Sequence, residues 1–264
     1  MSHAAIQAAS ANPLLTDAQV RHYHDEGFVL LGKILDDRQL EAIRADEATF
    51  RTTGTDIESP LSEHAGRNPN IFRSMLHDHS PIVREIACHG HHLDQVVQLL
   101  GNENVLMSYN QMVTKLPIAD DQKGQFPWHQ DNGYSDLNPG TNLTVWIALD
   151  DVDEQNGCVW VAPRLHRNGL LPHNSVSEQS WHLRMDLEGN GIPARLKAGE
   201  AVAFTGYTPH RSLGNHTQAA RRAFFIGYAD PIAIELRTGQ PVRAKGTTWM
   251  ARGRAPIRDR AATG

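Results

Sequence analysis

Hydrophobic positions in the first hundred residues recur at helical spacing. Residues 16–27 begin with Thr16, a residue type that caps helix N-termini, and end in glycine. The apolar run 28–35 predicts a short strand, and the segment 37–50 predicts a second helix. A third helix is predicted over 80–101, between a Ser-Pro start and a Gly stop. The first part of the chain is therefore expected to be mainly helical.

Later positions change to short strand-like runs. The stretch 51–70 is rich in Thr, Ser, Gly, Pro and Asn without a clear period, and it is predicted as a long loop of the kind that often forms lids. After Gly101, apolar runs separated by turn residues dominate. The predicted strands are 104–117, 143–152, 158–163, 200–204 and 221–229. Helices followed by many short strands favour a mainly β sandwich or barrel, and we expect a jelly roll.

The 264 residues fit one domain. Residues 1–15 are small and polar and are expected to be flexible. The remainder, 16–264, is expected to form a single domain, with helical support over 16–101 and a barrel core over about 102–230. The role of the C-terminal tail, residues 231–264, stays open between covering the active site, mediating association and remaining loose.

Composition excludes some classes of function. The chain is 40% hydrophobic and 21% charged, with a net charge of −5, which argues against a nucleic-acid binder. The N-terminus lacks the pattern of a signal peptide, and no apolar run reaches membrane-spanning length. Cys88 and Cys158 have no C-x-x-C spacing. We expect a cytoplasmic protein with reduced thiols that acts on a small molecule, with no nucleic-acid or membrane partner; the sequence leaves the oligomeric state unknown.

The segment 127–134, PWHQDNGY, carries the first chemical signal. His129 and Asp131 are separated by one residue, so on an extended strand both side chains point to the same face. One further histidine would complete the two-histidine, one-carboxylate triad of non-haem iron sites. H-x-D is common by chance, and most of the 15 histidines are expected to be structural.

A second signal lies about eighty residues later, where a strand and turn lead to PHRSLGN. His210 is placed to supply the third ligand, and Ser212 follows two residues on. Arg221 opens the next apolar strand, where its planar guanidinium is suited to bind a carboxylate through two hydrogen bonds. Taken singly, these residues are better explained as a core histidine and a surface arginine pair.

The combined pattern resembles the phytanoyl-CoA dioxygenase family, Fe(II)/2-oxoglutarate-dependent oxygenases on a double-stranded β-helix. The resemblance covers roughly residues 20–230 and includes PWHQD, PHRSLGN and the GC-x-x-x-AP-x-x-H-x-x-G run over 157–169. It implies that Fe(II), 2-oxoglutarate and dioxygen are the cofactor and cosubstrates. It also implies that the iron ligands are His129, Asp131 and His210.

The resemblance further implies a set of cosubstrate contacts. Arg221 matches the position that pairs with the distal carboxylate of 2-oxoglutarate, and Ser212 matches the hydroxyl that supports it. Trp146 resembles the family's aromatic wall beside the cosubstrate. Gln111 lies on a strand that faces the cosubstrate in relatives, but Tyr109 shares its face, and either could make the contact.

Two neighbouring cations are less clearly assigned. Arg222 follows Arg221 directly and is expected to point to the opposite face of the strand. Lys115 could add positive charge to the site or simply cap its strand.

The intact Asp131 bears on the reaction type. Some relatives that halogenate carry a small residue at this position, so hydroxylation or another oxidation, with release of succinate and CO2, is expected here instead of halogenation. A zinc hydrolase, a metal-dependent isomerase on the same barrel and a non-catalytic cupin-like binding protein are the alternatives. The serine–arginine pair has no obvious use in a hydrolase.

Residues that contact the substrate are harder to predict. The loop 51–79, the turn after Asp131 and the segment 158–173 are expected to border the pocket. The residues proposed from these segments are Asn132, Tyr134, Trp160, Arg164, His166 and His173. Each also has a structural interpretation, in which, for instance, His166 does no more than hold a turn and Trp160 does no more than fill the core. The identity of the substrate does not follow from the sequence.

Overall fold

The structure, a computed structural model, describes residues 13–53, 70–119, 124–176, 183–189, 191–242 and 249–254. The first helix, α1 (Asp17–Glu26), begins at the predicted cap. The Thr16 side chain accepts from the backbone N–H of Gln19, and the Gln19 side chain accepts from the Thr16 N–H, which forms a capping box. Gly27 ends the helix in the left-handed conformation. The following β1 (Phe28–Lys33) and α2 (Asp37–Thr53) also agree with the sequence prediction.

The helix predicted over 80–101 is wrong in one respect, because the structure has two helices there. They are α3 (Pro81–His89) and α4 (Leu93–Leu100). Gly90 separates them with extended backbone (φ −65°, ψ 148°), and a Cβ at this position would lie 2.6 Å from both the His92 ring and the Ile86 carbonyl oxygen. The hydrophobic spacing on both sides of Gly90 is helical, so the break was not visible in the pattern.

The described residues form a seven-stranded antiparallel sheet, called here the larger sheet. Its order is β1-β11-β6-β13-β3-β15, and β2 also pairs with β3. Besides β1, its strands are β2 (Asn70–Ser74), β3 (Val105–Lys115), β6 (Leu143–Ala148), β11 (Glu200–Thr205), β13 (Arg221–Ala229) and β15 (Trp249–Arg252). β2 begins at the last residue of the segment 51–70 predicted as a loop, and α2 extends into its first residues, 51–53. The remainder of that segment, 54–69, lies outside the described residues.

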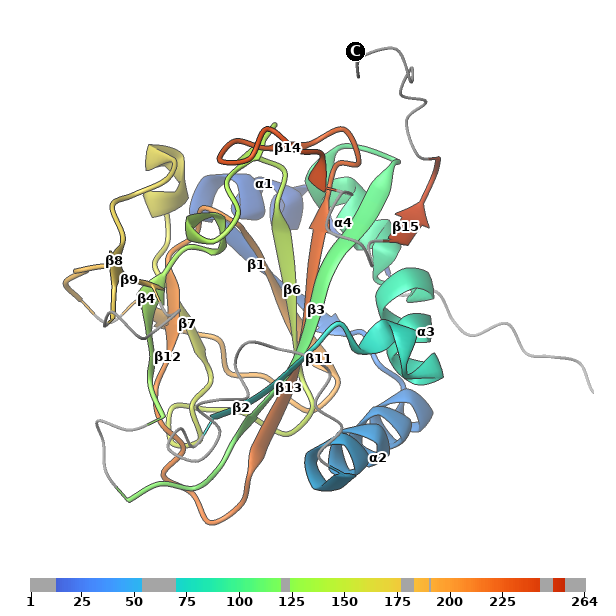
Figure 1. Ribbon diagram of the computed structural model, residues 1–264, viewed down its shortest axis with the longest axis vertical. Coiled ribbons are helices and arrows are strands. Elements are labelled where there is room, and N and C mark those ends of the chain that lie inside the picture. Colours follow the sequence, from blue (N-terminus) through green and yellow to red (C-terminus); the bar gives the residue numbers. More distant parts are fainter. Residues whose placement is uncertain are drawn as a thin grey trace, which may run out of the picture.

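A four-stranded sheet, called here the smaller sheet, stands to the left in Figure 1. Its order is β10-β7-β12-β4, with β4 (Phe126–His129), β7 (Val159–Val161), β10 (Ile192–Pro193) and β12 (His210–Ser212). Two short pairs complete the strands: β5 (Leu137–Asn138) with β14 (Ile234–Glu235), and β8 (Asn174–Ser175) with β9 (Leu183–Arg184).

The hydrophobic core has two main parts, one on each face of the larger sheet. On one face, side chains from α1–α4 pack against alternate residues of the strands, such as Val145 and Phe224. On the other face, Trp146 and Ala223 pack with Val159 and Val161 of the smaller sheet. The inward side chains of the two sheets therefore meet in one interior, which is where a site between the sheets would lie.

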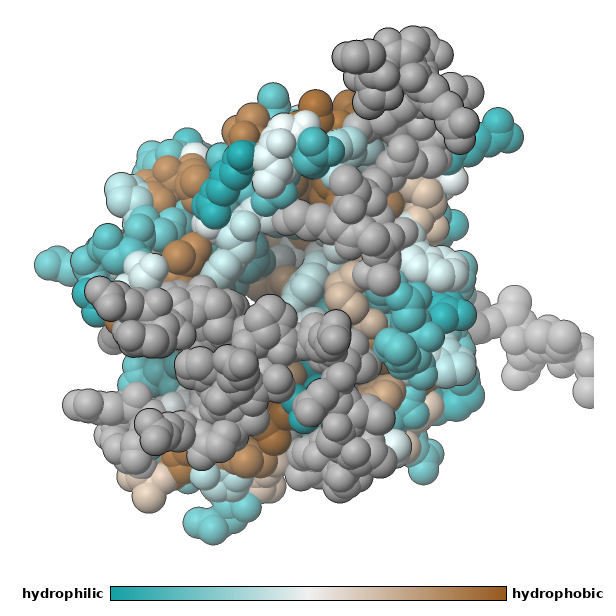
Figure 2. Space-filling view, viewed as in Figure 1, coloured by the Kyte–Doolittle hydropathy of each residue, from teal (hydrophilic) through white to brown (hydrophobic). Residues whose placement is uncertain are grey.

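This arrangement is the expected mainly β fold with N-terminal helices, a double-stranded β-helix or jelly roll. Figure 2 shows a mostly polar surface with apolar side chains gathered near the top, in the region of β14, where Ile232, Ile234 and Leu236 are exposed. None of the helices in the described part of the chain is both long and apolar enough to cross a membrane.

Candidate metal and cosubstrate site

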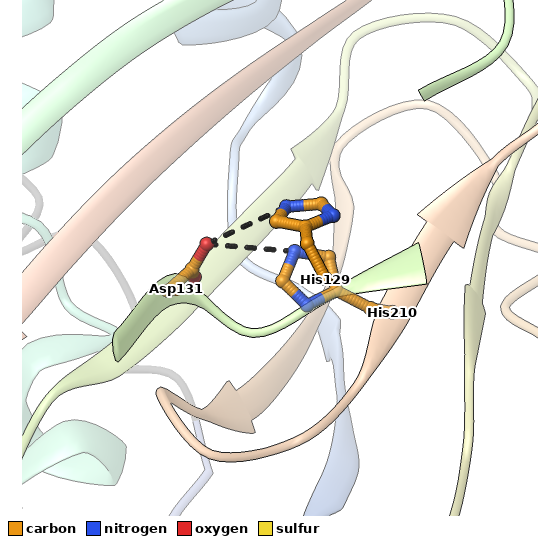
Figure 3. Close-up of side chains that lie close together, drawn as sticks. All are labelled: His129, Asp131 and His210. Atoms are coloured by element: carbon orange, nitrogen blue, oxygen red, sulfur yellow. Dashed lines mark ion pairs between the residues drawn. The ribbon is translucent and has the colours of Figure 1, made fainter. Parts of the chain in front are cut away.

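His129, Asp131 and His210 meet at the interior edge of the smaller sheet. His129 ends β4, and His210 begins β12 directly opposite it in the strand pairing. Asp131 Oδ1 lies 3.8 Å from His129 Nε2 and 3.5 Å from His210 Nε2 (Figure 3). The nearest ligand atoms of the three residues all lie within 4.8 Å of one another. The sequence suggested that Asp131 lies on the same strand as His129. In the structure it instead begins a short 3-10 turn, Asp131–Gly133.

Hydrogen bonds fix the orientation of each of these side chains. His129 Nδ1–H donates to the Pro127 carbonyl (2.8 Å), and His210 Nδ1–H donates to the Thr208 carbonyl (3.0 Å). Because a carbonyl can only accept, each Nδ1 carries the proton, and in a neutral ring each Nε2 then presents its lone pair toward Asp131. Such contacts to the distal ring nitrogen are the usual way in which proteins orient metal-binding histidines.

Gln130, between His129 and Asp131, anchors this segment and was missed by the sequence analysis. Its backbone N–H donates to His173 Nε2 (3.0 Å). Its buried amide donates to the carbonyls of Gly169 and Tyr207 and accepts from the N–H of Leu171. The middle residue of H-x-D is therefore structural, and His173, predicted as a substrate contact, is held in this network.

Arg221 is buried on the inner face of the larger sheet, with 2% of its surface exposed. Its Nη2 donates to the Gly157 carbonyl (2.8 Å), its Nε to the Asn156 carbonyl (3.4 Å), and its guanidinium lies 5.4 Å from the centre of the Trp146 ring. Nη1 is buried and has no hydrogen-bond partner among the described residues. Burial lowers the pKa of Arg221 to about 10, so the group remains a cation at neutral pH. A buried cation with an unused donor is suited to receive a carboxylate.

Arg222 points away from this interior, as strand alternation predicts. Its Nε and Nη2 bind both carboxylate oxygens of Asp150 at 3.0 and 2.6 Å, and its backbone N–H donates to the same group. The two consecutive arginines therefore differ in role. Arg222 has the acidic partner Asp150, whereas the described residues that accept hydrogen bonds from Arg221 do so through backbone carbonyls.

Other predicted cosubstrate contacts also line the interior. Ser212 follows His210 on the same face of β12 and is buried. Gln111 lies opposite the inward-facing strand position of Phe225, and its amide donates to Ser74 Oγ (2.9 Å) and Tyr109 Oη (3.0 Å). Burial raises the pKa of Tyr109, the hydrogen bond with Ser74 lowers it, and the charge of Asp131 raises it further. The Tyr109 hydroxyl therefore stays protonated.

The turn after Asp131 lies close to the metal triad. The Tyr134 ring lies edge-on to His129, with the ring centres 5.8 Å apart, and its hydroxyl accepts from the Leu183 N–H. Asn132 is fully buried, and its side-chain oxygen accepts from Asn142. Tyr134 therefore contacts a triad residue directly, whereas the side-chain oxygen of Asn132 is bound by Asn142.

Three further predicted substrate contacts are not brought to the triad. Trp160 lies opposite Arg211 in the strand pairing, on the face of the smaller sheet that His210 does not share. Arg164 forms a bidentate ion pair with Glu26 at the end of α1. His166 hydrogen-bonds to the His24 carbonyl, also in α1. These contacts attach the segment after β7 to the first helix.

Comparisons with known proteins define the class of this protein. The model of the phytanoyl-CoA dioxygenase family matches residues 23–223, so the chain belongs to this family. It is 27% identical over 225 residues to a methylphosphonate hydroxylase of Gimesia maris, covering 82% of each chain. It is 22% identical over 237 residues to the human peroxisomal phytanoyl-CoA dioxygenase, covering 83% of this chain and 69% of the human one.

Solved structures share the fold at lower identity. The 2-oxoglutarate-dependent carbocyclase SnoK of nogalamycin biosynthesis superposes with a TM-score of 0.69 at 20% identity, covering 91% of this chain and 98% of that one. The epimerase SnoN, solved with Fe3+, 2-oxoglutarate and a nogalamycin compound, gives 0.68 at 19% identity, with 92% and 96% covered. With the family match and the triad, the protein is an iron- and 2-oxoglutarate-dependent oxygenase that uses dioxygen.

Proposed function

We propose that this enzyme hydroxylates or otherwise oxidises a small-molecule metabolite, with release of succinate and CO2, at an iron held by His129, Asp131 and His210. The observation that carries the proposal is the convergence of these side chains within 4.8 Å, in an interior that also contains the buried cation Arg221. Two imidazoles and one carboxylate are the donor set of non-haem iron(II) oxygenases, and they leave coordination positions for cosubstrates.

Each part of the interior then has a task. Bound iron with 2-oxoglutarate and dioxygen supplies the oxidising power. The free Nη1 of Arg221 receives the distal carboxylate of 2-oxoglutarate, Ser212 supports that carboxylate, and Trp146 and Gln111 border the cosubstrate. A charge-assisted pair at one end and chelation at the other fix the cosubstrate in a single orientation.

Aromatic rings pack against the two histidines of the triad. The Phe204 ring lies 4.4 Å from the His210 ring, and the Phe126 ring lies 4.4 Å from the His129 ring, measured between ring centres. Both rings pack beside metal-binding imidazoles and reduce the polarity around them. A dry site strengthens the electrostatic interactions that orient the bound groups and limits side reactions.

Hydroxylation is favoured over halogenation because the carboxylate of Asp131 is present and is held by a hydrogen bond from Thr144. The similarity to a methylphosphonate hydroxylase makes organophosphonates the first compounds to screen. The hydroxyls of Ser74 and Tyr109, beside Gln111, could orient a polar substrate. A cytoplasmic location goes with this proposal; both cysteines are unbridged.

An anaerobic titration tests the proposal. Iron(II) is added to the apo-protein and then 2-oxoglutarate, and the visible metal-to-ligand charge-transfer band is followed. We expect the band in the wild type and in His89→Ala, a change on the exposed surface of α3, and its loss in His210→Ala. An iron-loaded wild type without the band would contradict the proposal and favour the isomerase, hydrolase or binding-protein alternatives. Oxygen uptake and succinate release then identify the substrate.

A further inference from the structure

A second buried cation, Lys115, lies beside Arg221. The two residues are directly opposite each other in the pairing of β3 with β13, so their side chains leave the sheet on the same face. Each has 2% of its surface exposed. Two like charges side by side in a dry interior are unfavourable unless a ligand or an acidic group compensates them.

No acidic group within the described residues contacts either cation. Lys115 Nζ donates to the Gly124 carbonyl (2.5 Å), and Arg221 donates to backbone carbonyls. The nearby carboxylate of Asp150 is bound by Arg222 from the other face of the sheet. Burial, and then the charge of Arg221, hold the pKa of Lys115 well below its ordinary value. Within the described residues the two basic groups thus face each other with no carboxylate between them, and a bound carboxylate would favour the protonated form of Lys115.

The backbone is shaped to admit the lysine. Gly157 has φ +84°, and a Cβ there would lie 3.1 Å from Lys115 Cδ and 2.6 Å from the Leu213 carbonyl oxygen. The same glycine provides the carbonyl that accepts from Arg221. On the other side of Lys115 in the sheet, Asn70 also donates to the Gly124 carbonyl. Among the described residues, Lys115 is therefore surrounded by neutral groups and by Arg221, which argues against a role limited to capping its strand.

We propose that Lys115 determines cosubstrate specificity together with Arg221: the two cations jointly select a 2-oxo acid that carries a second, distal carboxylate. This inference rests on the proposed function, because it assigns Arg221 to that carboxylate. Two cations offset the desolvation of the incoming carboxylate better than one does, and the carboxylate in turn relieves the repulsion between them. A 2-oxo acid with a neutral tail gains nothing from either group.

Binding measurements with a matched pair of ligands test the proposal. The ligands are 2-oxoglutarate and 2-oxopentanoate, which has the same chain length but ends in a methyl group. Binding to the iron(II)-loaded protein is followed anaerobically by the charge-transfer band. In Lys115→Met we expect the Kd of 2-oxoglutarate to rise about 10- to 100-fold, the cost of losing one charged contact. The Kd of 2-oxopentanoate should stay within about twofold, whereas a purely structural defect would weaken both ligands alike.

Companion variants sharpen the outcome. Lys115→Arg keeps the charge and should retain most of the preference for 2-oxoglutarate. Arg221→Met should keep a residual preference, supplied by Lys115. Lys197→Met removes an exposed lysine that pairs with Asp151 and should change neither Kd.

Several results would overturn the inference. They are an unchanged Kd for 2-oxoglutarate in Lys115→Met, equal weakening of both ligands, or complete loss of the preference in Arg221→Met alone. If Lys115→Met fails to fold, the residual preference in Arg221→Met decides the question. Absence of the charge-transfer band in the wild type would instead contradict the proposed function, and the inference with it.

Discussion

The hydroxyl of Thr144 donates a hydrogen bond to Oδ2 of Asp131. Thr144 lies on β6 of the larger sheet, whereas Asp131 follows β4 of the smaller sheet. Asp131 Oδ1 faces both triad histidines, so the bond to Oδ2 fixes which oxygen is turned toward the metal position. The larger sheet thereby orients Asp131, a proposed metal ligand that follows a strand of the smaller sheet.

Replacement of Thr144 by valine should weaken iron binding. Loss of a group that orients a metal ligand typically costs about 10- to 100-fold in metal affinity. Competition with a chromophoric iron(II) chelator measures the Kd. Thr114→Val is the matched control, because Thr114 is also buried and hydrogen-bonded, but to Glu47 on the helical face of the sheet. Equal iron affinity in wild type and Thr144→Val would show that Asp131 needs no such support.

The two neighbouring arginines should separate cosubstrate binding from stability. Arg221→Met should raise the Kd of 2-oxoglutarate by a factor that corresponds to about 2–4 kcal/mol, because a desolvated charge pair is lost. Arg222→Met should leave that Kd unchanged and lower the free energy of unfolding by about 1 kcal/mol, because the pair with Asp150 is only partly buried. Charge-transfer titration and urea unfolding measure the two quantities. The reverse pattern would exchange the two roles.

Gly157→Ala should damage both the fold and the cosubstrate site. Its added Cβ would meet the Leu213 carbonyl oxygen at 2.6 Å, and the positive φ adds strain. Gly189→Ala has a similar φ (+93°) but nothing within 4 Å of the added Cβ, so it measures the conformational cost alone, about 1 kcal/mol. We expect Gly157→Ala to lose clearly more stability than Gly189→Ala in thermal unfolding. Equal losses would mean that the turn adjusts without disturbing Lys115 and Arg221.

His92 should make stability depend on pH. It is fully buried against Tyr228, whose hydroxyl donates to the Ala87 carbonyl and accepts from His92 Nε2–H (2.8 Å). Burial, and to a lesser degree the charge of His91, lower the pKa of His92 from 6.5 to about 4. Above pH 6.5 both folded and unfolded chains hold it neutral. Between pH 6.5 and about 4, His92 takes up a proton only in the unfolded chain. The free energy of unfolding therefore falls as the pH falls, by roughly 3 kcal/mol at most.

Urea unfolding between pH 4 and 7.5 measures this dependence. His92→Gln removes the titrating group and should flatten the profile relative to wild type. His89→Gln, on the exposed surface of α3, should leave the wild-type profile in place. A wild-type slope that survives in His92→Gln would assign the effect to another group.

Local signals in the sequence were sufficient where the structure is set by neighbouring residues. Thr16 and Gly27 bound α1 as predicted, because capping depends on positions only a few residues apart. The alternation that separates Arg221 from Arg222 follows from strand geometry in the same way. Features that depend on tertiary contacts could not be predicted from the sequence pattern. A Cβ at Gly90, where the helix breaks, would meet the His92 ring and the Ile86 carbonyl oxygen, and the bond from Gln130 to His173 joins residues 43 apart.

The division of the site between two sheets has a consequence for the whole barrel. His129 and His210 belong to the smaller sheet, Asp131 lies in the turn that follows β4, and Arg221 belongs to the larger sheet. Under the proposed function, a bound 2-oxoglutarate contacts the metal at one end and Arg221 at the other, and so connects the two sheets. Ligands that bind only the folded state raise its melting temperature, and the rise grows with the logarithm of the free ligand concentration once this exceeds the Kd. Filling of this site should therefore be readable as a thermal shift of the entire protein, without any knowledge of the substrate.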